Sequence, residues 1–544
     1  MSTETINERF DMVAKTFQGL EEVLADELRA LGAEDVTPGR RMVAFSGDKQ
    51  MLYRANFACR TALRILKPFY KFQSTDADDL YEKVKQYDWS QIMSPDKTFA
   101  IDVTAFGEEF KHSRFVTYRV KDAIADFFME REGRRPSIRL TNPHLQLDVH
   151  ISGRDVILSL DSSGEPLYKR GWRVAQTDAP INEVLAAGII KLSGWDGQCD
   201  LIDPMCGSGT FLVEAALIAA NIAPGVYRKE YAFQQWPDYD EELFSEIYND
   251  DSQEREFTHK IYGYDIAHQA IDIAGRNVKN ASVAKMVELQ QRDLRDWTEA
   301  PAGGMLITNP PYGQRLKYDN IEALYEALGD KLKHVFVGYD AWVIGYDRDL
   351  TDLIGLKASV RYPLFNGALE CELRQYKIFE GKYNEMRGRG EDIKNDDFRA
   401  SSSARRPRRD DDRPRPPFNR EDRPRRDDDR PRQPFNREDR PRRDDDRPRP
   451  PFNREDRPRR DDDRQRPPFN REDRPRRDDD RQRPPFNRED RPRRDDDRQR
   501  HEEDRHSERY ANRVLRSREP SLGADKEVPI IHGRRKSWKR KDLE

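Results

Sequence analysis

The segment LIDPMCGSGT, residues 201–210, decides the fold of this chain. Its start, Leu201-Ile202-Asp203, is typical of a short buried strand, and Gly207 and Gly209 favour a tight turn. The following residues FLVEAAL are strong helix formers, so the glycine turn opens a helix directly after a strand. This order predicts the first unit of an open α/β sheet, in which ligands bind at the carboxyl ends of the strands.

The glycine turn predicts a cofactor without a phosphate. A dinucleotide fingerprint would need a third glycine at position 212, where this chain has Leu212. Asp203 at the strand end disfavours a phosphate and suits a cationic amino-acid group. We therefore predict S-adenosylmethionine as the cofactor, with Asp203, Gly207 and Gly209 shaping its loop. A generic tight turn is the alternative.

Two further strands are predicted to end in an aspartate. IYGYD (residues 261–265) places Asp265 where a carboxylate can accept from both ribose hydroxyls. VELQQRD (residues 287–293) places Asp293 where it can accept from the adenine amino group. The polar and aromatic residues 223–259 between the first helix and the second strand indicate an insertion. A single aspartate is more often a helix cap, but this order of features predicts a site.

The apolar strand MLIT (residues 305–308) leads into Asn309-Pro310-Pro311-Tyr312. The side-chain oxygen of Asn309 and the carbonyl of Pro310 are placed to accept the N–H protons of an exocyclic amine, which frees its lone pair for methyl transfer. Tyr312 is suited to stack on a base taken out of its helix. We predict Asn309, Pro310 and Tyr312 as catalytic residues and no metal. An ordinary Asn-Pro turn is the alternative, and the loop would serve adenine as well as guanine.

In these motifs the chain resembles class I methyltransferases that modify guanine N2 in RNA. The likeness is closest to the bacterial 23S rRNA (guanine-N2)-methyltransferase with an N-terminal THUMP domain, and it covers roughly residues 10–382. The resemblance implies a Rossmann-like α/β fold with a seven-stranded mixed sheet, preceded by an α+β ferredoxin-like and THUMP region. Other matching segments are 168–173 (YKRGWR), 178–180 (DAP), 223–225 (APG) with Trp236, and 366–371 (NGALEC).

The chain departs from this family at two points. Asn182 stands where relatives usually carry a basic residue, ahead of the equivalent of Glu183. The long bacterial enzyme continues into a second methyltransferase domain, which we do not expect here. We predict a ferredoxin-like region at 1–65, a THUMP RNA-binding domain at 66–165, a methyltransferase domain at 166–384 and a tail at 385–544.

The pattern of apolar residues in the N-terminal region predicts a small α+β unit. Apolar residues at 20, 23, 24, 28 and 31 predict a helix that stops at Gly32, and residues 43–45 and 99–104 alternate like strands. A further helix is expected from about 116 to 129. Basic residues occur in 52–64 and 111–114. Taken without the resemblance, these residues are expected to be solvated cations on helix surfaces. The resemblance implies instead that they contact RNA.

The tail repeats a 17-residue unit, close to RPRRDDDRPRPPFNRED, in which phenylalanines recur in register at 418, 435, 452, 469 and 486. One phenylalanine per unit cannot offset an ordering entropy of roughly 1–2 kcal/mol per residue, so we predict disorder. Each unit carries six arginines against five acids. It therefore suits weak RNA tethering or a solubilising spacer, and the basic residues 534–541 are the better RNA contact.

Composition agrees with this division. The net charge of −4 favours local basic patches over a globally basic surface, and the cysteines at 59, 199, 206 and 371 lack disulfide or metal-ligand spacing. We interpret Cys206 as structural. No apolar signal core or membrane-spanning run is evident, so a cytoplasmic protein is expected.

We therefore predict an S-adenosylmethionine-dependent RNA methyltransferase that modifies N2 of a guanine in 23S rRNA. Its expected partners are ribosomal RNA and large-subunit assembly intermediates, with no membrane. The alternatives are guanine-N2 methylation of tRNA, adenine-N6 methylation of DNA, and a non-enzymatic RNA-binding ribosome-assembly factor.

Overall fold

The computed structural model describes residues 8–110, 112–301, 303–312, 320–367 and 369–379. The predicted disorder of the repeat tail and the RNA-binding role of its basic end lie outside these described residues. Within them, no helix has both the length and the apolar character needed to cross a membrane.

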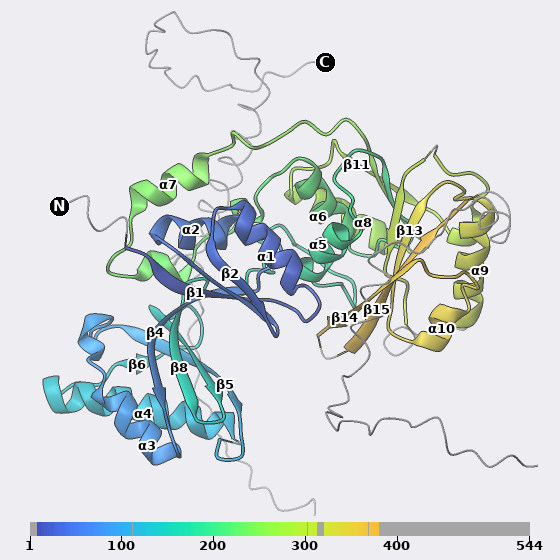
Figure 1. The fold of residues 1–544 in the computed structure, drawn as a ribbon. Helices are drawn as coiled ribbons and strands as arrows, with labels where there is room; N and C mark the ends of the chain where they lie inside the picture. Colours follow the sequence, from blue (N-terminus) through green and yellow to red (C-terminus); the bar gives the residue numbers. More distant parts are fainter. Residues whose placement is uncertain (1–7, 111, 302, 313–319, 368, 380–544) are drawn as a thin grey trace, which may run out of the picture. The chain divides into compact units, whose positions relative to one another are not determined.

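The N-terminal part is built on one eight-stranded sheet with the order β2-β3-β1-β4-β8-β7-β5-β6 (Figure 1). Its strands are β1 (Phe10–Lys15), β2 (Glu34–Gly39), β3 (Met42–Gly47), β4 (Arg64–Gln73), β5 (Thr98–Phe106), β6 (Ser137–Ile138), β7 (Leu145–Ser152) and β8 (Asp155–Asp161). The associated helices are α1 (Glu21–Ala30), α2 (Lys49–Ala58), α3 (Ala77–Gln86) and α4 (Ser113–Glu132). The predicted helices and strands of this region are confirmed.

Strand β4 belongs to both halves of this sheet. Its first residues, Arg64 to Leu66, pair with β1. From Leu66 to Gln73 the same strand pairs with β8. The predicted boundary between residues 65 and 66 therefore falls inside a continuous strand.

The C-terminal part is a seven-stranded sheet with the order β11-β10-β9-β12-β13-β15-β14, which confirms the predicted class I architecture. The strands are β9 (Leu201–Asp203), β10 (Ile261–Asp265), β11 (Val287–Gln291), β12 (Met305–Thr308), β13 (Asp340–Gly345), β14 (Val360–Asn366) and β15 (Leu369–Lys377). The first five strands of this order are parallel, and β15 is antiparallel to both of its neighbours.

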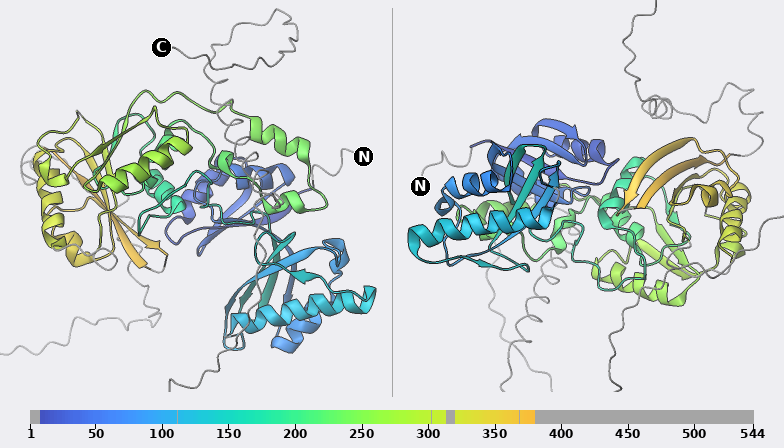
Figure 2. Two further views of the ribbon diagram at one scale, coloured as in Figure 1. Left: turned by 180° about the vertical axis from the view of Figure 1, so that it is seen from behind. Right: turned by 90° about the horizontal axis from the view of Figure 1, so that it is seen from below.

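Helices cover both faces of this sheet (Figures 1 and 2). One core contains side chains of α5 (Glu183–Leu192), α6 (Thr210–Ala219) and α8 (His268–Asn280), and the other contains those of α9 (Ile321–His334), with α10 (Arg348–Asp352) beside it. Leu201 and Ile202 are neighbours on β9, yet they belong to different cores because successive side chains of a strand point to opposite faces. The continuous apolar run of β9 follows from burial on both sides.

The predicted insertion at 223–259 holds α7 (Glu241–Asn249) and two short 3-10 turns. Its aromatic side chains pack against α2. The rings of Phe233 and Tyr53 are stacked with centroids 4.3 Å apart, and Phe244 meets Tyr53 edge to face. The insertion is therefore a packing element held by aromatic contacts.

Two of the basic residues considered for RNA contact are engaged within the protein. Arg60 is buried, and the partly buried Arg64 forms ion pairs with Asp161 and Asp102. A charged side chain that leaves water needs a partner, and buried Asp161 provides one for Arg64. RNA contact by this basic stretch stays a prediction. Arg114, at the start of α4, is exposed.

Candidate active site

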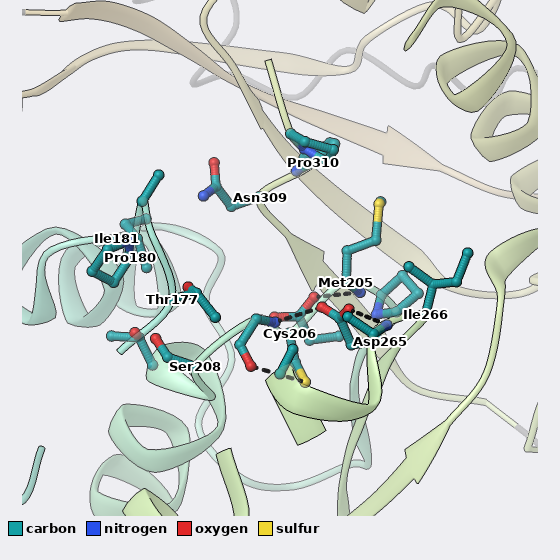
Figure 3. Close-up of a pocket in the computed structure, with 18 of the residues that line it drawn as sticks. Thr177, Pro180, Ile181, Met205, Cys206, Ser208, Asp265, Ile266, Asn309 and Pro310 are labelled. Atoms are coloured by element: carbon teal, nitrogen blue, oxygen red, sulfur yellow. Dashed lines mark hydrogen bonds between the residues drawn. The ribbon is translucent and has the colours of Figure 1, made fainter. Parts of the chain in front are cut away.

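A cavity of about 390 Å³ lies at the carboxyl edge of the seven-stranded sheet, where the glycine turn and the loop after β12 face each other (Figure 3). The predicted site residues that line it are Asp203, Gly207, Asp265, Asp293, Asn309, Pro310 and Tyr312. Gly209 does not line the cavity; it is the N-cap residue of α6. The strand ends therefore bring together residues that are more than a hundred positions apart in the sequence.

Asp203 is a buried carboxylate without a cationic partner among the described residues, since its bonds come from two neutral donors. Its Oδ1 atom accepts from the Thr308 hydroxyl at 2.8 Å and from the Met205 N–H at 3.1 Å. Burial raises the pKa of Asp203 to about 7, although both donors act in the opposite direction. A bound cation would stabilise the charged form of this side chain.

The glycine turn is held by Asp265. The Gly207 N–H donates to Asp265 Oδ2 at 3.0 Å, and the Ala267 N–H donates to Oδ1 at 2.9 Å. Burial raises the pKa of Asp265 as well. Gly207 and Gly209 have φ angles of 52° and 79°, in the left-handed region, and a Cβ on Gly209 would lie 3.1 Å from the Ala274 side chain. Both turn positions therefore favour glycine.

Asp293 lies on the cavity wall but outside the strand that was expected to hold it. Strand β11 ends at Gln291, and Asp293 instead accepts from the Arg295 N–H at 2.8 Å and caps the 3-10 turn Leu294–Asp296. An aspartate that bonds the backbone two residues on ends a strand in this way. The Arg295 guanidinium also contacts both carboxylate oxygens and lowers the pKa of Asp293.

Asn309 follows β12 directly and presents an unused acceptor. Its Oδ1 atom is buried and has no hydrogen-bond partner among the described residues. Leaving such an atom unpaired costs about 1–3 kcal/mol, so a donor from a bound molecule would bind favourably there. Pro310 lies beside it at the end of the strand (Figure 3). Tyr312 lines the same cavity, and its hydroxyl accepts from the Asn366 side chain at 3.0 Å.

One wall of the cavity was not among the predicted site residues. It consists of residues 176–181, including Thr177, Pro180 and Ile181 (Figure 3). Asn277 of α8 ties the approach to this wall to the glycine turn, since its Oδ1 accepts from the Val174 N–H and its Nδ2 donates to the Ser208 carbonyl. The only sequence signal was the family likeness at 178–180.

Arg173 and Asn182 organise the base of this wall. Arg173 pairs with Glu183 at the start of α5 and donates to the hydroxyls of Ser208 and Thr210. Asn182 caps α5 by accepting from the Val184 N–H at 2.9 Å. Asn is among the preferred N-cap residues, so Asn182 has a structural role at this position.

A buried ion pair lies behind the glycine turn. The Arg170 guanidinium is 3.4 Å from Glu214 Oε1 on α6, and the two side chains are 2% and 0% exposed. Trp172 Nε1 donates to the same carboxylate at 3.3 Å. This pair connects the YKRGWR segment to the helix that the turn opens.

Comparison with known proteins agrees with this geometry. Residues 170–375 match the family described as "RMKL-like, methyltransferase domain", 74–161 match the THUMP domain and 11–66 match the "RlmL ferredoxin-like domain". The "Putative RNA methyltransferase slr0064" of Synechocystis is 39% identical over 371 residues, which are 67% of this chain and 96% of that protein. The chain belongs to the RMKL-like methyltransferase family. Its RMKL-like methyltransferase domain is preceded by the ferredoxin-like and THUMP regions that the sequence predicted.

Longer relatives and solved structures extend this result. The "Ribosomal RNA large subunit methyltransferase K/L" of Syntrophotalea carbinolica is 39% identical over 379 residues, and the chain spans about half (53%) of its length. The structure of "SMU.472, a putative methyltransferase complexed with SAH" is 29% identical with a TM-score of 0.61, and the "possible methylase from Clostridium difficile 630" is 31% identical with a TM-score of 0.63. Both matches cover 69% of this chain and 100% of the other.

The cofactor of this RMKL-like methyltransferase is S-adenosylmethionine, as predicted. The residues fit the cofactor, because two carboxylates with raised pKa values, the buried Asp203 and the partly buried Asp265, face a cavity and a glycine turn that admits close backbone approach. In the described residues, no three His, Cys, Asp or Glu side chains form a group that could hold a metal ion.

Proposed function

We propose that this methyltransferase modifies the exocyclic N2 of a guanine in 23S rRNA. The observation that carries the proposal is the buried Oδ1 of Asn309 in the cofactor cavity, which has no hydrogen-bond partner among the described residues. An exocyclic amine offers the N–H donor that this atom lacks. The match to a THUMP domain and the likeness to relatives named as RNA and ribosomal RNA large-subunit methyltransferases support RNA as the polymer that carries the base.

The proposed catalysis rests on alignment of the amine. Asn309 Oδ1 and the Pro310 carbonyl accept its two N–H protons and direct its lone pair toward the cofactor. S-adenosylmethionine supplies an electrophilic methyl group on a sulfonium. Tyr312 stacks on the base after it leaves its helix.

The same proposal assigns three carboxylates to the cofactor. Asp203 holds its cationic amino-acid end beside the turn formed by Gly207 and Gly209. Asp265 accepts from the ribose hydroxyls, and Asp293 accepts from the adenine amino group. Asp265 accepts from the Gly207 N–H, and Asp293 accepts from Arg295. When the cofactor is bound, each carboxylate would accept hydrogen bonds from both its protein partner and the cofactor.

A second candidate function is methylation of adenine N6 in DNA. One solved structure that matches at 29% identity and a TM-score of 0.61 is named a "predicted N6-adenine-specific DNA methylase" from Listeria monocytogenes. The amine-binding atoms do not distinguish the two bases. We favour RNA because the THUMP match occupies residues 74–161.

The test is nucleoside mass spectrometry of ribosomal RNA, transfer RNA and DNA from cells with and without the protein. We expect loss of N2-methylguanosine at one position of 23S rRNA. Loss of the mark from tRNA instead, or of N6-methyladenine from DNA, would replace the proposed substrate. If no mark is lost and purified protein fails to bind S-adenosylhomocysteine, a non-enzymatic assembly role remains.

The active-site part is tested with Asn309→Ala. We expect methyl transfer to fall by 100-fold or more, on the order of the loss seen when a transition-state hydrogen-bond partner is removed. Affinity for S-adenosylhomocysteine should be unchanged. The matched control is Asn249→Ala, because Asn249 is exposed and its side chain bonds Ser245 within its own helix α7.

Several expectations remain part of this proposal. We retain the division into 1–65, 66–165, 166–384 and 385–544, with β4 crossing the first boundary, together with a cytoplasmic location and large-subunit assembly intermediates as partners. Limited proteolysis of the full chain tests the division: we expect cleavage near 165 and 384 and none within β4.

A further inference from the structure

Three elements of the sheet meet at Tyr312. Tyr312 is in the loop after β12, Tyr346 follows β13, and Asn366 is the last residue of β14. Because β15 runs antiparallel to β13, with Gly345 opposite Glu372, the β14–β15 turn lies at the carboxyl edge of β13. Asn366 therefore reaches the same edge of the sheet as the loop with Asn309.

The contacts of Tyr312 restrict its ring from two directions. The Asn366 Nδ2 donates to the Tyr312 hydroxyl at 3.0 Å, and the ring of Tyr346 lies 5.7 Å from that of Tyr312, centroid to centroid, at 40°. Asn366 pairs with Leu369 of β15 at the end of the β14–β15 ladder. The ring is thus held at its hydroxyl end by a strand residue of the sheet.

Asn366 is absent from the cavity wall, whereas Tyr312 is part of it. A role in binding the cofactor is therefore excluded by position, and a role through Tyr312 remains. A ring held at one end loses little conformational entropy when a base stacks on it, whereas a free ring would lose more.

We propose that Asn366 is a positioning residue, which holds the Tyr312 ring in the orientation that receives the target base. This inference rests on the stacking role assigned to Tyr312 in the proposed function. It gives a purpose to the NGALEC segment, which the sequence singled out only by family likeness.

A double-mutant cycle tests the proposal. The variants are Asn366→Ala, Tyr312→Phe and their combination, with Asn249→Ala as control, and the assay follows methyl transfer from labelled S-adenosylmethionine to 23S rRNA from cells lacking the protein. Each single variant should lower kcat about fivefold, the effect of one neutral hydrogen bond. The double variant should be no slower than either single one, and affinity for S-adenosylhomocysteine should stay constant. A double variant slowed by the product of the two single effects overturns the proposal.

A measurement without RNA tests the positioning role of Asn366 independently of which substrate the enzyme modifies. With 3-fluorotyrosine at position 312, the fluorine resonance should shift or broaden in Asn366→Ala and stay unchanged in Asn249→Ala. If the wild type methylates no 23S rRNA and the resonance still responds, the proposed substrate is wrong and the positioning role stands. A resonance identical in wild type and Asn366→Ala overturns the positioning role.

Discussion

Asp203→Asn should make the cofactor-free protein more stable. The carboxylate is 1% exposed, and burial raises its pKa from 3.8 to about 7. A shift of roughly three pKa units corresponds to about 4 kcal/mol between the two protonation states. Asn can preserve both local hydrogen bonds, because Thr308 and Met205 donate to the same atom, Oδ1. The substitution thus removes the charge and retains the shape.

The sign follows from the direction of the shift. The unfolded chain loses this proton near pH 3.8 and the folded chain near pH 7, so the stability that Asp203 contributes is fully present below pH 3.8 and is lost as the pH rises to about 7. An asparagine at position 203 does not ionise, so the variant does not lose stability as the pH rises. We expect a gain in the free energy of unfolding of up to about 4 kcal/mol at pH 8 and about 2 kcal/mol at pH 5.

Urea unfolding without cofactor at the two pH values measures this gain, and calorimetry with S-adenosylhomocysteine should show at least tenfold weaker binding because a charge-assisted contact is lost. The control is Asp349→Asn on the exposed face of α10, for which any change should be equal at both pH values. A variant less stable than wild type at both pH values, or equally stabilised at both, would refute the assignment of Asp203 as a costly buried charge.

Three further predictions concern the same site. Gly209→Ala should lower the free energy of unfolding by about 1–3 kcal/mol and weaken cofactor binding, because φ is +79° and the new methyl group would crowd α8; urea unfolding and calorimetry measure both. Affinity for S-adenosylhomocysteine should fall between pH 8 and pH 6, by at most about tenfold per unit, because Asp203 becomes protonated; calorimetry at constant temperature follows it. Glu214→Ala should cost about 3–5 kcal/mol by leaving Arg170 buried without its carboxylate, whereas loss of the exposed Glu165 should cost under about 1 kcal/mol in the same urea assay.

The sheet and the strand-end residues could be predicted because local rules determine them. A buried strand followed by glycines and a helix former leaves little choice of fold, and parallel strands bring Asp203, Asp265 and Asn309 to one edge. The exact end of β11 could not be predicted, because an aspartate at position 293 is compatible both with a longer strand and with capping the turn that contains Arg295.

Other features depend on tertiary contacts that leave no periodic signal. The 176–181 wall is an irregular segment held by Asn277 from a distant helix. Arg64 is typical of a surface cation in the sequence, yet it is partly buried because Asp161, almost a hundred residues away, compensates its charge. The contact of Asn366 with Tyr312 depends on the antiparallel pairing of β15 with β13, which the local sequence does not indicate.

The sharing of β4 has a practical consequence for dissecting the molecule. A truncation between residues 65 and 66 would divide β4, so that β1 would keep only Arg64 and Ile65 of β4 as partners and the rest of β4 would lose its β1 neighbour. Strand edges opened in this way promote aggregation. Fragments for RNA-binding studies should therefore retain residues 8–161 as a unit, with β4 intact between its two neighbours.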